Sequence, residues 1–137
     1  MLLRILRLFA ATNPMKNSVA LRIAAVSGLL AVTLGAFGAH GLKEVLARNG
    51  TTAIWDKAVL YQFIHTVMLF ILGGRTPLRL GPWFCFLIGI LVFSGSLYLL
   101  ALTNLLWLGA ITPVGGISFI AGWLWLAVAP LAKGSAG

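Results

Sequence analysis

The sequence has 137 residues, of which 61% are hydrophobic and only 9% are charged, and its mean hydropathy is +1.04. A soluble domain carries about 25% charged residues, so the composition excludes water as the main solvent and predicts one small membrane domain. The net charge of +8 comes from Lys and Arg residues that flank apolar stretches, a placement that favours topology setting and lipid headgroups over nucleic-acid binding.

A basic N-terminal segment occupies residues 1–17 and carries Arg4, Arg7 and Lys16. Its apolar stretch is too short for a signal peptide, and Arg7 interrupts it. We expect the segment to be disordered or to lie on the membrane surface as a short amphipathic turn. Met15 offers an alternative start.

The first membrane span is predicted over 19–41. The 17 residues between Arg22 and His40 carry no ionisable side chain, and with their flanks they reach the roughly 20 residues that a span needs. Small residues recur at every fourth position, which lets another helix approach closely in lipid. We expect this ridge to pack within the bundle. The helix-packing residues are Ser27, Ala31, Gly35 and Ala39.

A short amphipathic helix is predicted over 42–48, at the membrane surface, because its apolar residues fall on one side. Asn49-Gly50 is a stop signal. The second span follows over 52–72, and Thr51 or Thr52 can cap it.

The third and fourth spans share a stretch of 53 residues, 80–132, without Asp, Glu, Lys, Arg or His. One helix of that length would be about 80 Å long, whereas a bilayer core is about 30 Å thick. Two spans are therefore predicted, over 82–102 and 105–131, with a turn at Thr103-Asn104.

A break is predicted in the first third of the fourth helix, where Pro113 is followed by Gly115-Gly116. The complete pattern predicts an all-α fold in a single domain over 18–133. That fold is a polytopic membrane protein, a four-transmembrane-helix bundle with a short interfacial amphipathic helix between helices 1 and 2.

The basic residues predict the orientation. With four spans, both termini lie on one side of the membrane, and seven of the ten Lys and Arg residues lie there. Cytoplasmic loops carry the excess of positive charge, so both termini are predicted in the cytoplasm, with the spans in the cell inner membrane. The seven are Arg4, Arg7, Lys16, Arg22, Arg75, Arg79 and Lys133, and the other three are Lys43, Arg48 and Lys57.

Few residues are suited to catalysis. An enzyme needs acids, bases or a metal at the reacting centre, and the sequence has only two acids, two histidines and one cysteine. We therefore expect no catalytic residues, no cofactor and no metal site. The candidate functional polar positions are His40, Tyr61, Gln62, His65, Ser94, Ser96 and Tyr98.

His65 is the strongest of these candidates, because an ionisable residue inside a span is costly and is a functional candidate by default. It either contacts a proton, a ligand or a cofactor, or is a neutral histidine hydrogen-bonded across the bundle to Ser94, Ser96 or Tyr98. His40, at the membrane edge, is expected to bond a helix end or to pair with Glu44.

Four motifs together resemble the domain-of-unknown-function 423 family, which includes YgdD-like bacterial inner-membrane proteins and the eukaryotic transmembrane protein 256. The resemblance covers about 19–131 and implies a four-helix membrane protein of uncharacterised function, with no catalytic residues to carry over. The motifs are LGAFGAHGLK over 34–43, Trp55 with AVLYQFIH over 58–65, FSGSLY over 93–98, and LGAITPVGG over 108–116 with AGW over 121–123.

Two functions follow as hypotheses. The first is a non-enzymatic subunit or assembly and scaffold factor, which contacts the lipid bilayer and packs against other integral membrane proteins or itself through its glycine-rich faces. The alternative is a small homo-oligomeric transporter or channel with a polar path around His65. An enzyme acting on a lipid-like substrate ranks third.

Overall fold

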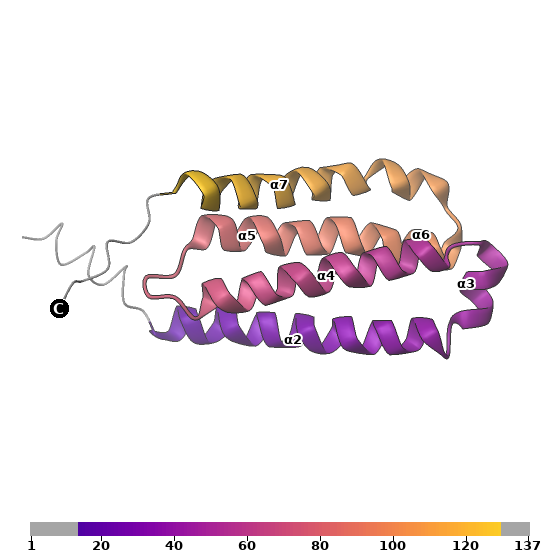
Figure 1. Ribbon diagram of the computed structural model, residues 1–137, viewed down its shortest axis with the longest axis horizontal. Coiled ribbons are helices and arrows are strands. Elements are labelled where there is room, and N and C mark those ends of the chain that lie inside the picture. The colour runs from indigo at the N-terminus through magenta and orange to yellow at the C-terminus, as the bar shows by residue number, and fades with distance from the viewer. Residues whose placement is uncertain (1–13, 130–137) are drawn as a thin grey trace, which may run out of the picture.

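The computed structural model describes residues 14–129, and this part of the chain is helical and contains no strand. Four of its helical segments are long and apolar enough to cross a membrane. The predicted fold class is therefore confirmed (Figure 1). The segments are Lys16–Ala39, Thr52–Gly73, Leu80–Thr103 and Leu106–Val128.

Helix α2, Pro14–Ala39, begins before the predicted start of the first span. Residues 14–17, which the prediction assigned to a separate N-terminal segment, are part of this helix; residues 1–13 lie outside the described residues. Helix α3, Lys43–Asn49, is the predicted short helix between the first two spans. Gly50 ends it in the left-handed conformation, with φ of 67°, which glycine adopts without steric cost.

Helix α4, Thr52–Gly73, starts without the predicted side-chain cap. The Thr51 hydroxyl instead donates to the Ala101 carbonyl over 2.8 Å, and the Asn49 amide donates to the Ala101 and Leu102 carbonyls. Both carbonyls belong to the last turn of α6, where helix carbonyls lack intrahelical partners. The α3–α4 connection therefore caps the third span rather than its own helix.

The third span is a continuous run of α5 (Leu80–Gly89), a π-helical turn η1 (Ile90–Ser94) and α6 (Gly95–Thr103). Asn104 ends it with φ of 56°, which confirms the turn predicted at this position. The π turn was not predicted.

The fourth span has the predicted break, but the break lies before α7 and the two glycines do not cause it. A 3₁₀ turn, η2 (Leu106–Ala110), leads into α7 (Thr112–Val128), and Pro113 lies in the first turn of α7, where a missing N–H costs no hydrogen bond. Gly115 lies inside the continuous helix, where a Cβ atom would come within 2.3 Å of the Phe93 backbone nitrogen. The glycine therefore permits close packing on η1 and does not break the helix.

The four spans have two central and two outer members. Helix α2 packs mainly against α4, and α7 packs mainly against α5 and η1, so α4 and the third span lie between them (Figure 1). Where glycines lie between helices, large side chains fill the space, as Trp55 does at Gly38 and Phe119 at Gly89. Much of the small-residue surface is thus used inside the chain itself.

The two ends of the bundle differ in charge. The start of α2, the α4–α5 loop and the end of α7 lie at one end, and α3 lies at the other (Figure 1). We call the first the basic end, because it carries Lys16, Arg75 and Arg79 and no acid. Glu44 and Asp56 both lie at the α3 end.

Candidate functional site

Gln62 is the centre of a hydrogen-bonded group that joins three helices. Its Nε2 donates to the Ser27 carbonyl over 3.0 Å, and the Tyr98 hydroxyl donates to its Oε1 over 2.8 Å. The hydroxyls of Ser27 and Thr66 lie 2.6 Å apart beside it. This Gln62 network, Ser27, Gln62, Thr66 and Tyr98, fixes α2 and α6 to α4, and its buried polar groups satisfy one another.

His65 lies on a different face of α4 and uses both ring nitrogens. Its Nδ1 lies 2.7 Å from the Tyr61 carbonyl, and because a carbonyl only accepts, Nδ1 carries the proton. Its Nε2 accepts the indole N–H of Trp123 over 3.1 Å. The partners thus assign a neutral histidine in one tautomer. His65 thus forms a hydrogen bond to another helix, as one of the two hypotheses predicted. Its partner is Trp123, however, and not Ser94, Ser96 or Tyr98, so the predicted partners were wrong.

Aromatic rings surround His65. Its ring stacks on Phe119 with centroids 3.6 Å apart and an interplanar angle of 12°, and Phe86 lies 5.4 Å away. Tyr61 stacks on Phe93 at 4.5 Å. We call this set the aromatic cluster, and it consists of Tyr61, His65, Phe86, Phe93, Phe119 and Trp123.

Ser94 and Ser96 belong to neither group. The Ser94 hydroxyl donates to the Ala58 carbonyl over 2.9 Å, which ties η1 to α4. The Ser96 hydroxyl donates to the Phe93 carbonyl over 3.0 Å and lies 2.8 Å from the Thr112 hydroxyl on α7. The polar candidates are therefore held in separate local contacts and do not line one continuous path within residues 14–129.

His40 is remote from these groups. It follows the last turn of α2 at the α3 end, its side chain is exposed, and it forms no ion pair with Glu44. Its backbone N–H bonds the Ala36 carbonyl at the helix end.

The four predicted packing residues of α2 do not all lie on the face that contacts α4. Ser27 and Ala31 are buried, and at Gly35 a Cβ atom would lie 3.4 Å from Val59 on α4. Ala39 is exposed, however, and Gly38 takes the last place on this face. The predicted inclusion of Ala39 was therefore wrong.

Tyr61 differs from the other candidates because its hydroxyl forms no hydrogen bond with any residue of 14–129. The side chain is 37% exposed although its ring is packed on Phe93. It lies about 14 Å into a helix about 33 Å long, so it is close to the middle of the membrane. A hydroxyl without a partner in hydrocarbon costs free energy.

The sequence analysis did not predict the hydrogen bonds that tryptophan side chains form between helices. The indole N–H of Trp55 donates to the Leu34 carbonyl on α2, and that of Trp83 donates to the Leu69 carbonyl on α4. Trp83 is only 3% exposed, although it lies in the first turn of α5, near a span end where tryptophan side chains favour the membrane interface. These bonds could have been expected on chemical grounds, because a buried indole N–H needs an acceptor.

Within the described residues, no three His, Cys, Asp or Glu side chains are grouped so that they could hold a metal ion. His65 offers no free nitrogen lone pair, since Nε2 already accepts from Trp123. The arrangement is suited to holding helices together.

Comparison with known proteins gives one consistent set of relatives. The model of a family described as "Protein of unknown function (DUF423)" matches residues 34–116. A UPF0382 membrane protein of Staphylococcus epidermidis is 46% identical over 114 residues, which cover 80% of this chain and 92% of that protein. UPF0382 membrane protein YwdK of Bacillus subtilis is 41% identical over 114 residues, which cover 78% and 91%. No solved structure shows a significant match.

Proposed function

The chain belongs to the DUF423 family of membrane proteins of unknown function, as its motifs predicted, and from this premise we propose that it is a non-enzymatic subunit or assembly factor of a membrane complex. It acts by packing against another integral membrane protein through the exposed side of the aromatic cluster. The proposed location is the cell inner membrane, with both termini in the cytoplasm.

The state of the polar residues supports a non-enzymatic role. Gln62 and Tyr98 form hydrogen bonds between neighbouring helices of the same chain. His65 uses one ring nitrogen for the Tyr61 carbonyl of its own helix and the other for Trp123 on α7. A general base needs a free lone pair within reach of a substrate proton. The one imidazole lone pair of His65 is taken by Trp123, so this residue supports the bundle rather than proton transfer.

The observation that carries the proposal is the unpartnered hydroxyl of Tyr61. The ring is held in place by stacking on Phe93, so the side chain has little freedom to seek another partner in its own chain. Lipid tails offer no acceptor at this depth. A polar group on a helix of a neighbouring membrane protein would satisfy the hydroxyl, and such interhelical bonds stabilise association by about 0.6 to 2 kcal/mol.

Trp123 adds exposed surface on the same side of the aromatic cluster, which supports this side as the binding surface. Trp123 is 43% exposed although its N–H is bonded to His65. Tyr61 and Trp123 thus present large, rigid aromatic surface at a fixed position, and rigid aromatic side chains dominate the energetics of many interfaces. The glycine-rich faces, which the sequence suggested for this purpose, pack largely inside the chain.

A small homo-oligomeric transporter or channel is the second candidate. The π turn η1 and the break before α7 are the features that favour it, because irregular helices mark moving parts in transporters. It ranks lower because the polar side chains around His65 are engaged in separate hydrogen bonds.

The proposal is tested by gentle affinity purification of the tagged protein, expressed from its own promoter and extracted from native membranes, followed by native mass spectrometry. A foreign membrane protein in stoichiometric amount is the expected result and would identify the pathway. A pure homo-oligomer would overturn the subunit role, and flux assays would then test the second candidate.

A further inference from the structure

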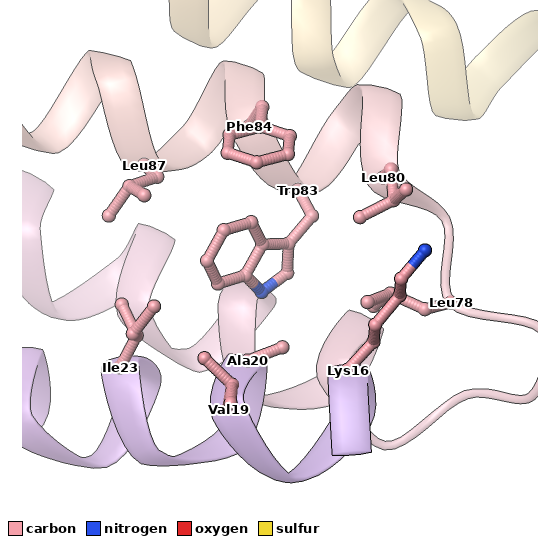
Figure 2. Close-up of a pocket in the computed structure, with 9 residues that line it drawn as sticks. All are labelled: Lys16, Val19, Ala20, Ile23, Leu78, Leu80, Trp83, Phe84 and Leu87. Carbon is pink, nitrogen blue, oxygen red and sulfur yellow. The ribbon is translucent and has the colours of Figure 1, made fainter. Parts of the chain in front are cut away.

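An apolar groove lies between the first turns of α2 and α5, at the basic end of the bundle (Figure 2). Its volume is about 580 Å³, within the range of about 300–1,000 Å³ that is usual for sites of small ligands. Helix α2 contributes Lys16, Val19 and Ile23, and α5 contributes Trp83, Phe84 and Leu87. Among the lining residues that belong to 14–129, Lys16 is the one with a charge.

Trp83 forms a fixed part of the groove wall. Its indole N–H donates to the Leu69 carbonyl over 3.2 Å, and the side chain is 3% exposed. In Figure 2 the ring lies between α2 and the remainder of α5. Since the ring is held by this bond and by packing, the groove is preformed rather than opened by a moving side chain.

Hydrogen bonds also fix the end of the groove that is nearest to Lys16. The side-chain amide of Asn17 donates to the Gly73 carbonyl over 3.0 Å and to the Arg75 carbonyl over 2.7 Å. These bonds tie the first turn of α2 to the α4–α5 loop and so fix the helix that carries Lys16. The Lys16 ammonium projects beside Leu78 and Leu80 at the end of the groove (Figure 2).

The charged side chains near this end of the groove are all positive. The only acids in the sequence are Glu44 and Asp56, and both lie at the α3 end of the molecule. A Lys side chain at this position, with no carboxylate among the groove residues, complements an anion at the membrane surface. Each such cation adds roughly 1 kcal/mol to binding at an anionic lipid surface.

The length of the groove fits one leaflet. From Lys16 to Ile23, and from Leu80 to Leu87, the lining extends along each helix for about 10 Å. The hydrocarbon of one leaflet is about 15 Å deep. The groove is therefore long enough to hold most of one acyl chain of a lipid whose headgroup lies at Lys16, and too short to cross the bilayer.

We infer that this groove is a binding site for one anionic phospholipid. An acyl chain packs between α2 and α5 on the exposed side chains of Val19, Leu80 and Phe84, and the headgroup phosphate pairs with the Lys16 ammonium. The site is separate from the face at Tyr61 and does not depend on the proposed function.

The test is native mass spectrometry of the purified, delipidated full chain, titrated separately with phosphatidylglycerol and phosphatidylcholine. The wild type is expected to bind one phosphatidylglycerol about fivefold more tightly than phosphatidylcholine, the preference that one cation gives. Lys16→Gln should abolish the preference while both lipids still bind. Val19→Trp should fill the groove and weaken both lipids; Val19 is 55% exposed, so the fold should tolerate the change.

Matched controls separate this site from the general lipid shell. Lys43→Gln removes the same charge at the α3 end, and Val32→Trp adds the same bulk at a position of α2 that is 62% exposed and outside the groove. Both should behave as the wild type. Equal binding of the two lipids by the wild type, or equal effects of either variant and its control, would overturn the inference.

Discussion

The indole N–H of Trp123 donates a hydrogen bond to Nε2 of His65 over 3.1 Å, and it joins α7 to α4 between residues 58 positions apart. Because Nδ1 is bonded to the Tyr61 carbonyl, the histidine must act as donor at one nitrogen and acceptor at the other. In this geometry His65 is a neutral residue that connects α4 to α7, and both of its ring nitrogens have a hydrogen-bond partner.

The tautomer of His65 is directly measurable. We expect solid-state ¹⁵N NMR of the protein in lipid bilayers to show a protonated Nδ1 and an unprotonated Nε2, since a carbonyl accepts at the first and an indole N–H donates to the second. The assignment uses His65→Phe as the spectral blank, with His40 as the remaining signal. A proton on Nε2, or on both nitrogens, would contradict this account.

Two glycines of the third and fourth spans should respond oppositely to the same change. A Cβ at Gly115 would meet the Phe93 backbone, so Gly115→Ala should destabilise the protein by about 1–3 kcal/mol. At Gly95 nothing lies within 4 Å, so Gly95→Ala should be neutral or stabilise α6 by up to roughly 1 kcal/mol.

Unfolding by titration with a denaturing detergent measures both variants. Equal stability of Gly115→Ala and the wild type would show that α7 does not approach η1 as closely as described.

The orientation is a third prediction. In a Cys85→Ser background, Lys43→Cys should react with a membrane-impermeant maleimide added to intact cells, and Arg75→Cys should react only after the membrane is opened. The expectation follows from the excess of Lys and Arg at the basic end. Labelling in the reverse pattern would place the termini on the outer side.

The fold was largely predictable, because its signals are local. The length of apolar runs, Asn49-Gly50 and Thr103-Asn104 together predicted four spans, the short helix α3 and their order, and the structure agrees. The π turn of the third span has no such signal, since a single wider turn leaves the apolar composition unchanged.

The errors at the site have geometric causes. A step of four residues overshoots a helical turn by about 40°, so a ridge at every fourth position has rotated by about 120° after three steps. Ala39 therefore leaves the face that Ser27 begins, and Gly38 replaces it. The partner of His65 could not be predicted, because Trp123 lies 58 positions away on another helix and nothing local in the sequence links the two residues.

The two tyrosines of the chain give the most direct test of the central claim, that the exposed side of the aromatic cluster binds another membrane protein. Tyr98 donates to Gln62 inside the bundle, whereas the Tyr61 hydroxyl has no partner in residues 14–129. Tagged wild type, Tyr61→Phe and Tyr98→Phe would be purified gently from native membranes and compared by native mass spectrometry and by detergent unfolding. We expect Tyr61→Phe to lose the partner at unchanged stability, and Tyr98→Phe to keep the partner while losing about 1 kcal/mol of stability. Full retention of the partner by Tyr61→Phe would contradict the account.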